Sequence, residues 1–173
     1  MIIGEEEIPN ERALLTQEDG PMMASSASVK YIVIHCSATR STRDYTAEQL
    51  LRDHKTRGFR TVGYHFYIRK NGDIKTTREI ERIGAHAKGH NQNSIGICYE
   101  GGLDCHGHPA DTRTEWQIHS MRVLILALLR DYPGCRVCGH RDLSPDLNGN
   151  GEIEPEEWIK ACPCFEVKAE WDG

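Results

Sequence analysis

Short runs of β-branched and aromatic residues recur along the chain and predict strands that are buried in a sheet. Four such runs are present, at residues 29–35, 63–68, 94–99 and 136–139. The pair Asn71-Gly72 follows the second run and predicts a hairpin turn into a further strand at residues 73–76. The strand pattern therefore predicts a β-sheet that contains at least one hairpin.

Two segments with helical signals lie between these runs. Thr46, with Gln49 three positions later, has the pattern of a capping box, and Gly58 favours the end of a helix. A longer segment begins after a second capping pattern, Thr112 with Glu115. Its apolar positions fall at helical spacing, at Ile118, Met121, Leu124, Ile125 and Leu128. A Pro-Gly pair follows them and ends this second helix.

A third helix is predicted near the C-terminus, from Pro155 through Trp158 to Ala161. Strands and helices thus alternate along the chain, which predicts an α/β layered fold. The length of 173 residues favours one domain. Residues 1–28 are acidic and then rich in Ser and Ala, and we interpret them as a flexible N-terminal extension to a domain that spans residues 29–173.

Composition narrows the class of protein. Hydrophobic residues at 38% and charged residues at 27% are typical of a soluble globular domain. The net charge of -5 argues against broad binding to nucleic acid, and no apolar run has the length of a membrane-spanning helix. Glutamates near the N-terminus are the opposite of the basic start of a secretory signal. We therefore expect synthesis in the cytoplasm without an export signal, and no insertion into a membrane.

The seven cysteines are an odd number, so metal ligation explains some of them better than a disulfide framework does. His35 ends one predicted strand, His140 follows another, and Cys162 follows the predicted last helix. Two imidazoles and one thiolate leave the fourth tetrahedral position of Zn²⁺ open for water, as catalytic zinc sites require. Each of the three residues also has a simpler interpretation, since a histidine at a strand end is commonly structural and a buried cysteine is usually inert.

Several segments of the chain resemble, in the same order, the type-2 N-acetylmuramoyl-L-alanine amidase family, and most closely its short phage-lysozyme branch. The matching segments are 34–39 (IHCSAT), 62–66 (VGYHF), 84–91 (GAHAKGHN), 93–97 (NSIGI), 101–104 (GGLD), 139–145 (GHRDLSP) and 160–163 (KACP). The resemblance implies a single domain with a central mixed β-sheet flanked by helices, as in the related peptidoglycan recognition proteins. It also implies zinc-dependent hydrolysis of the amide bond between N-acetylmuramic acid and L-alanine in bacterial peptidoglycan.

The resemblance assigns roles to individual residues. It implies that His35, His140 and Cys162 are the zinc ligands and that Tyr64 and Lys160 lie beside the metal as catalytic residues. A lysine ammonium and a tyrosine hydroxyl are both suited to stabilising a developing oxyanion, and either can pass a proton to the leaving amine. Which of the two transfers the proton stays open.

Two further residues belong to segments that line the substrate groove in similar proteins. The resemblance implies that His86 and Asn93 contact the peptide or the sugar, although both can also simply shape their loop. Cys164 lies two positions from Cys162 and is an alternative zinc ligand. Cys36 adjoins His35 in a strand, so its side chain is expected to face the opposite way, into the core.

The remaining histidines and cysteines are expected to have no part in the chemistry. Cys135 and Cys138 form a C-x-x-C pair, but no second pair at suitable spacing supports a structural zinc site. The other histidines are expected on the surface, on helices or in a polar loop, and these are His54, His106, His108 and His119.

Residues 146–157 are an insertion relative to the compact phage relatives and match an EF-hand calcium loop. The expected calcium ligands are Asp146, Asn148, Asn150, Glu152 and Glu157. Against this, Pro145 prevents the helix that enters a complete EF-hand, and such loops usually occur in pairs. The alternative is a turn rich in Asn and Gly that caps the last helix. Possible cofactors are therefore Zn²⁺ and, from this loop, Ca²⁺.

Two other functions compete with the amidase. A non-catalytic peptidoglycan-binding module shares the implied fold, but such binders typically lack the cysteine ligand. An unrelated zinc hydrolase keeps the metal site and changes the substrate. For the amidase we expect a monomer that acts on the cell wall after release by a phage-type lysis system or another delivery route.

Overall fold

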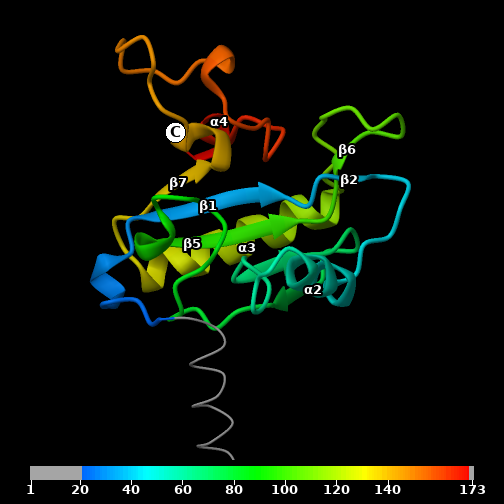
Figure 1. Cartoon of the computed structure of the whole chain (residues 1–173), viewed down its shortest axis with the longest axis horizontal. Helices are drawn as coiled ribbons and strands as arrows, with labels where there is room; N and C mark the ends of the chain where they lie inside the picture. The colour runs from blue at the N-terminus through cyan, green and yellow to red at the C-terminus, as the bar shows by residue number, and fades with distance from the viewer. Residues whose placement is uncertain (1–20, 172–173) are drawn as a thin grey trace, which may run out of the picture.

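The computed structural model describes residues 21–171, and a five-stranded sheet in the order β4-β3-β5-β1-β7 forms its centre (Figure 1). Its strands are β1 (Tyr31–Cys36), β3 (Phe66–Ile68), β4 (Ile74–Thr76), β5 (Ser94–Tyr99) and β7 (Arg136–Gly139). A separate two-stranded sheet pairs β2 (Thr39–Arg40) with β6 (Gly102–Leu103). All five strands predicted from the sequence are present, within a few residues of their expected bounds.

The pairing of the strands makes the sheet mixed. β1 lies between β5 and β7 and pairs parallel with both, so that Ile34 is level with Ile97 on one side and Gly139 on the other. β3 pairs parallel with β5, and β4 closes the edge antiparallel to β3 through the predicted Asn71-Gly72 hairpin. The predicted fold, a single α/β domain with a central mixed sheet, is confirmed.

Two long helices cover opposite faces of the sheet. They are α2 (Ala47–Thr56) and α3 (Glu115–Asp131), and a short helix α4 (Val167–Trp171) follows near the C-terminus. Residues 21–171 also contain four 3₁₀ turns, at η1 (Ser26–Ser28), η2 (Asn91–Asn93), η3 (His140–Leu143) and η4 (Pro155–Glu157). α3 lies behind β1 and β5 in the view of Figure 1, and α2 lies on the near side.

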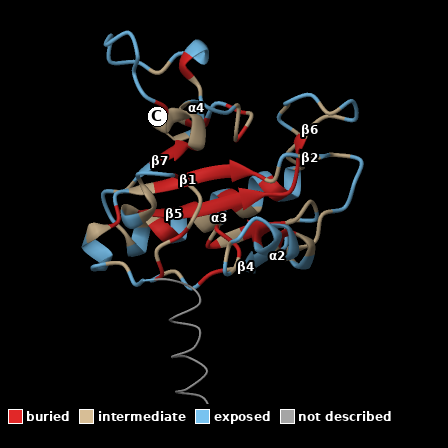
Figure 2. Cartoon of the chain, viewed as in Figure 1, coloured by how far each residue is buried: buried red, intermediate tan, exposed pale blue. Residues whose placement is uncertain are grey.

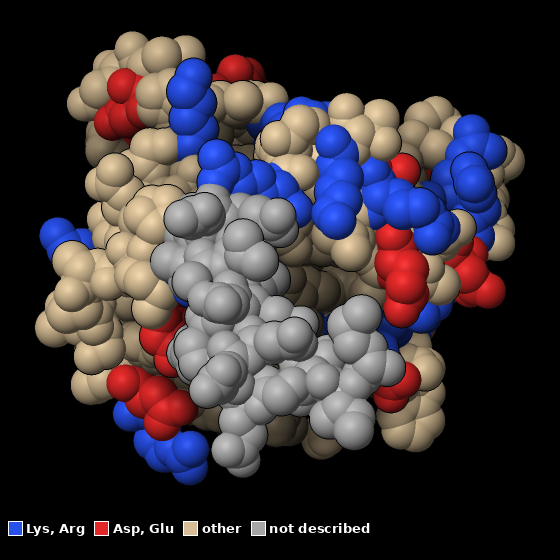
Figure 3. Space-filling view, turned by 60° about the horizontal axis from the view of Figure 1, so that its bottom comes forward, with Lys and Arg blue, Asp and Glu red and all other residues tan. Residues whose placement is uncertain are grey.

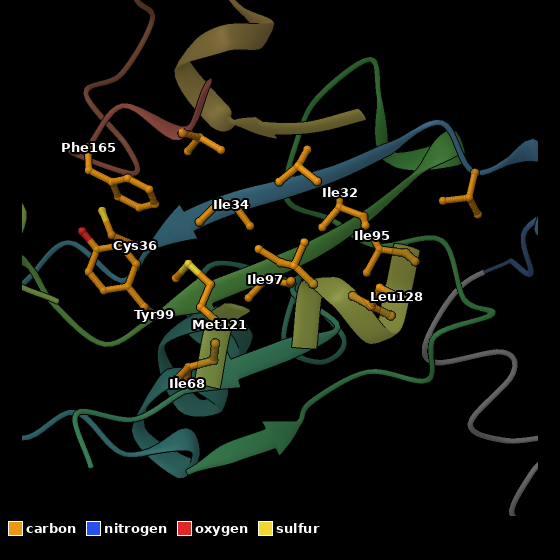
Figure 4. Packing of buried hydrophobic residues seen from close by; sticks show 14 residues of the cluster. Ile32, Ile34, Cys36, Ile68, Ile95, Ile97, Tyr99, Met121, Leu128 and Phe165 are labelled. Carbon is orange, nitrogen blue, oxygen red and sulfur yellow. The ribbon is translucent and has the colours of Figure 1, made fainter. Parts of the chain in front are cut away.

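The alternation of side chains along the strands divides the core into two clusters. On the α3 side, Ile32 and Ile34 of β1 pack with Ile95 and Ile97 of β5 and with Ile125 of α3 (Figure 4). On the α2 side, a smaller cluster consists of Leu50, Val62, Tyr67 and Cys98. Because both faces of the central strands are covered, β1 and β5 are buried along almost their whole length (Figure 2).

The first predicted capping box is confirmed and the second is displaced. The Thr46 side chain accepts a hydrogen bond from the backbone N–H of Gln49 and so begins α2. α3 begins instead with Thr114, whose side chain accepts from Gln117. The Thr112 hydroxyl is used elsewhere, because it accepts from the backbone N–H of Gly102. The second prediction therefore chose the wrong threonine.

The predicted helix from Pro155 to Ala161 is wrong. Only the 3₁₀ turn η4 forms there, and the backbone of Trp158 is already extended. The backbone groups that a helix would use are taken up by more distant partners. The N–H of Ile159 donates to the Ser144 hydroxyl, and the Cys162 carbonyl accepts from the N–H of Arg141. Lys160 and Cys162 therefore lie on an irregular segment rather than on a helix.

The predicted N-terminal extension, residues 1–28, is only partly covered, because residues 1–20 lie outside the described chain. In the described part, Met22 forms a β-bridge with Arg82, the N–H of Met23 donates to the carbonyl of Glu81, and the carbonyl of Pro21 accepts from the N–H of Ile83. Residues 21–23 thus contact the segment 81–83, and the boundary at residue 29 stays a prediction.

The surface carries charges of both signs. On the face shown in Figure 3, a row of Lys and Arg side chains crosses the upper part, and Asp and Glu side chains lie below it on both sides. Within residues 21–171, no helix combines the length and the apolarity that crossing a membrane requires.

Candidate metal centre and groove

The alternation of β1 places His35 on the α2 side of the sheet. Its neighbours Ile34 and Cys36 both pack into the α3-side cluster, so the side chain between them faces the other way. His35 is nevertheless only 1% exposed, because it lies below other side chains of the site. The predicted core position of Cys36 is confirmed.

His140 and Cys162 reach the same place from the C-terminal part of the chain. β7 runs parallel to β1, so His140, the residue after β7, lies beside the end of β1, with its ring centroid 4.7 Å from that of His35. Cys162 Sγ lies 3.8 Å from His35 Nδ1. The donor atoms of the three residues lie within 4.8 Å of one another, and the described chain contains no second group of this kind.

The segment that carries Cys162 is fastened to the strands. The Tyr99 hydroxyl donates to the Pro163 carbonyl at 2.6 Å, and the Arg141 N–H donates to the Cys162 carbonyl at 2.9 Å. Gly139 makes the close approach possible, because a Cβ at that position would lie 2.7 Å from Pro163 Cδ. The backbone N–H of Cys36 donates a hydrogen bond to Cys162 Sγ at 3.3 Å, which holds the sulfur beside the end of β1.

The alternative ligand Cys164 faces another way. Its Sγ lies 3.9 Å from Cys36 Sγ, in the core. Its hydrogen bond with Cys36 and its burial raise the pKa of the Cys164 thiol. The hydrogen bond with Cys162 and burial likewise raise the pKa of Cys36 to about 12. Both thiols are therefore protonated at neutral pH, whereas a metal ligand must be a thiolate.

The two histidines are kept neutral. Burial lowers the pKa of His35 well below its usual value, and the nearby titratable groups His86, His140 and Lys160 disfavour a positive charge on its ring further. Burial and the Lys160 ammonium lower the pKa of His140 as well. Neutral imidazole is the form that binds a metal, so the site is arranged for ligation before any ion arrives.

A groove of about 560 Å³ opens above the three ligands. Tyr64, Lys160 and His86 all line it, as do the cationic side chains Arg57 and Lys88. The groove contains no Asp or Glu among its lining residues in the described chain. It therefore offers a positively charged surface to an anionic substrate.

Tyr64 and Lys160 lie beside the metal centre, as the resemblance implies. The Tyr64 ring centroid is 4.9 Å from that of His35. Burial raises the pKa of Tyr64 well above its usual value, and negative charge on Cys98 and Cys162 adds to the effect, so its hydroxyl stays protonated. Lys160 is exposed on the irregular segment two residues before Cys162. The groove thus places a phenol and an amine beside the group of His35, His140 and Cys162.

His86 and Asn93 occupy different environments. His86 lines the groove, but its Nδ1 lies 2.9 Å from Nε2 of His35, so it contacts a ligand directly. Asn93 ends η2 and is absent from the residues that line the groove. Its side-chain oxygen is buried and has no hydrogen-bond partner in the described chain. The structure thus brings His86, but not Asn93, to the site.

Two histidines have a larger part than the sequence indicated. His54, expected on the surface, is 4% exposed, lines the groove and accepts a hydrogen bond from the Gly63 N–H. Its position four residues after buried Leu50 in α2 is the signal that marks the buried face. His65 is fully buried and joins the carbonyl of Arg82 to the N–H of Gly96.

The structure also places the remaining histidines and the pair Cys135 and Cys138. His106, His108 and His119 are exposed. Cys135 donates to the carbonyl of Val29, and Cys138 is buried, so neither belongs to a metal group of the described chain.

The loop 146–157 is held together by its own backbone. The carboxylate of Asp146 accepts from the N–H groups of Gly149 and Gly151, and that of Glu157 accepts from Leu147, Asn148 and Glu154. The same contacts hold the pKa of Glu157 below its usual value. The Asn148 and Asn150 side chains each accept from a backbone N–H two residues further on. Glu152 is exposed, and calcium finds no support in this geometry.

Comparison with known proteins agrees with this geometry. The family model described as N-acetylmuramoyl-L-alanine amidase matches residues 25–157, which include His35 and His140 but end before Cys162. The endolysin of Klebsiella phage KP32 is 36% identical over 82% of this chain and 84% of its own length. An endolysin amidase, LysCS of Clostridium intestinale, superposes with a TM-score of 0.65 at 25% identity, covering 88% of both chains. Drosophila PGRP-LB superposes with a TM-score of 0.62 at 24% identity, over 82% of this chain and 78% of its own.

The mixed sheet and the His–His–Cys group at its edge define an α/β protein whose groove contains three residues that could hold a metal ion. The match over most of the chain and the similarity to phage endolysins then fix the family. The chain belongs to the N-acetylmuramoyl-L-alanine amidase family.

Proposed function

We propose that this protein is a zinc-dependent amidase that hydrolyses the bond between N-acetylmuramic acid and L-alanine in bacterial peptidoglycan. One observation carries the proposal. In a chain of the amidase family, three residues from distant segments place two imidazoles and one thiol within 4.8 Å of one another, below an open groove. Endolysins and amidases among the relatives support the same activity.

The donor set fits zinc. Two neutral imidazoles and one thiolate are borderline-soft ligands in a number that leaves one tetrahedral position open. The Cys36 N–H donates a hydrogen bond to Cys162 Sγ, and His86 Nδ1 lies within hydrogen-bond distance of Nε2, the second ring nitrogen of His35. When bound, zinc supplies Lewis-acid chemistry, because it activates water as a nucleophile and polarises the scissile carbonyl.

Lys160 and Tyr64 supply the other catalytic functions, which are stabilisation of negative charge and transfer of a proton. The Lys160 ammonium faces the groove, where it stabilises negative charge on the carbonyl oxygen as water adds to the amide carbon. The Tyr64 hydroxyl, kept protonated by burial, donates a hydrogen bond to the same region. One of the two passes a proton to the leaving nitrogen, which departs as the amino group of L-alanine. The muramic acid retains the carboxylate.

The charge of the groove suits the binding of peptidoglycan. The groove is lined by the basic residues Arg57, Lys88 and Lys160, and the stem peptides of peptidoglycan carry free carboxylates.

We also propose a route by which the protein reaches the cell wall. Its endolysin relatives suggest release through a phage-type lysis system.

Metal exchange tests the zinc requirement. Purified protein is treated with a chelator, and release of soluble material from purified peptidoglycan is followed before and after zinc is restored. The proposal expects activity to be lost on chelation and recovered with zinc. Binding to peptidoglycan without cleavage in the zinc-loaded protein would contradict it and favour a recognition module.

A further inference from the structure

A chain of hydrogen bonds lies behind the metal ligand His35. His35 Nε2 lies 2.9 Å from Nδ1 of His86, and His86 Nε2 lies 3.2 Å from the hydroxyl oxygen of Ser94. The Ser94 hydroxyl in turn lies 2.7 Å from the backbone carbonyl of His90. Ser94 and His35 are almost fully buried, at 0% and 1% exposure, and His86 between them is half-buried in the groove wall.

The last acceptor sets the direction of every bond in the chain. A backbone carbonyl can only accept a hydrogen bond, so the Ser94 hydroxyl donates its single proton to the carbonyl of His90. The Ser94 oxygen must then accept from His86, which places the His86 proton on Nε2 and leaves Nδ1 bare. His86 Nδ1 accepts from His35 Nε2. The proton of His35 is thereby fixed on Nε2, and its Nδ1 lone pair faces Cys162, 3.8 Å from the sulfur.

The His86 ring has little freedom to turn away from this arrangement. A Cβ on Gly84 would lie 2.6 Å from the ring, and one on Gly96 would lie 2.7 Å from it, so the ring occupies space that only glycines leave open. The backbone N–H of His86 is held by the side-chain oxygen of Asn91 at 2.9 Å. The ring is therefore placed both by packing and by hydrogen bonds at its two nitrogens.

We propose that Ser94 is a positioning residue that acts through His86 to fix the tautomer of His35 and to aim its Nδ1 at the metal. The proposal rests on the proposed zinc site. It gives His86 a role in organising the metal centre, in addition to its place in the groove wall. It also explains why a polar hydroxyl is retained at a fully buried position of β5.

Zinc affinity measures the effect. In the Ser94→Ala variant, His86 Nε2 loses the hydroxyl oxygen as an acceptor, so the other tautomers of His86 and His35 become more accessible. We expect the zinc dissociation constant, measured by competition with a chromophoric chelator, to rise roughly tenfold or more. Ser120→Ala is the matched control, because the Ser120 hydroxyl also donates to a carbonyl, that of Gly72, but lies outside the groove. Equal zinc affinity of the two variants, both folded by circular dichroism, would overturn the proposal.

The tautomers can also be observed directly in the wild-type protein. Long-range ¹H–¹⁵N NMR spectra of the metal-free protein are expected to show His35 and His86 each protonated on Nε2 only. Protonation of His86 on Nδ1 would overturn the proposal even if Ser94→Ala fails to fold. This measurement needs no metal. A wild-type protein that does not bind zinc would therefore refute the proposed zinc site, whereas the NMR result tests the role of Ser94 separately.

Discussion

Two cysteines near the C-terminus, Cys162 and Cys164, lie two positions apart but face different surroundings. The sulfur of Cys162 lies near His35 Nδ1 and accepts from the Cys36 N–H. The sulfur of Cys164 faces the sulfur of Cys36 in the core. Sequence spacing alone left both as candidate ligands. The fold separates them by turning the chain at Pro163 between them.

The two cysteines are therefore expected to respond differently to the same substitution. Cys162→Ser should weaken zinc binding by at least about 100-fold, because a serine hydroxyl is a much poorer zinc ligand than a thiolate. Cys164→Ser should leave zinc stoichiometry unchanged and lower stability only. Metal content after gel filtration and competition with a chelator measure both effects. Loss of zinc from Cys164→Ser, with zinc retained in Cys162→Ser, would show that Cys164 rather than Cys162 is the zinc ligand.

His65 makes the stability of the protein depend on pH. Burial lowers its pKa from 6.5 to about 4, partly offset by the hydrogen bond to the Arg82 carbonyl. In the unfolded chain the ring takes up a proton near pH 6.5, whereas in the fold it stays neutral until about pH 4. Its contribution to stability is therefore fully present above pH 6.5 and is lost as the pH falls toward 4.

Urea unfolding of metal-free protein at pH 7.5 and at pH 5 tests this. The fall in unfolding free energy between the two pH values should be smaller in His65→Gln than in the wild type by about 2 kcal/mol, since the glutamine does not titrate. The variant should be less stable at pH 7.5, because it loses the bridge to Gly96. Equal falls in both proteins would contradict the neutral, buried state of His65.

The strands and helices that have a periodic sequence pattern were predicted correctly. The segment whose conformation depends on contacts with distant residues was not. The strands and α3 follow from alternation and helical periodicity, because each buries one continuous face. The helix expected at 155–161 fails, because Glu157 turns back to the amides of residues 147 and 148 and the following backbone bonds to Ser144 and Arg141. No sequence period encodes these contacts.

Glu157 is predicted to close the loop 146–157. Its carboxylate accepts three backbone N–H groups, from Leu147, Asn148 and Glu154. In Glu157→Ala, amide hydrogen exchange at these three residues should be faster by roughly tenfold. Glu156→Ala is the matched control, because Glu156 is the exposed neighbour and makes no such contact in the described chain. Unchanged exchange in Glu157→Ala would show that the loop is held by other means.

Across the whole molecule, the metal centre joins parts of the chain that are far apart in sequence. His35 ends β1, His140 follows β7, and Cys162 belongs to the C-terminal segment, drawn orange to red in Figure 1. The proximity of the three residues could be predicted because the resemblance groups them and the parallel strands β1 and β7 bring their ends together. The supporting contacts could not, since the hydrogen bonds that join His86 and Ser94 depend on how loops pack over the α2 side of the sheet.

Zinc is therefore expected to stabilise the whole fold. A ligand that binds only the native state at 100 times its dissociation constant adds about 2.7 kcal/mol to the free energy of unfolding. The melting temperature should rise when zinc is added to metal-free wild-type protein and should not change in Cys162→Ser. A similar rise in both proteins would show that zinc binds at another place.

The identity of the bond that is cleaved tests the central claim most directly. Purified peptidoglycan is digested with the zinc-loaded protein, and the soluble products are identified by mass spectrometry beside those from Cys162→Ala. The account predicts free stem peptides that begin with the amino group of L-alanine, together with glycan strands that lack peptide, and neither product from the variant. Sugar fragments that still carry intact peptides would show a glycosidase and contradict the account.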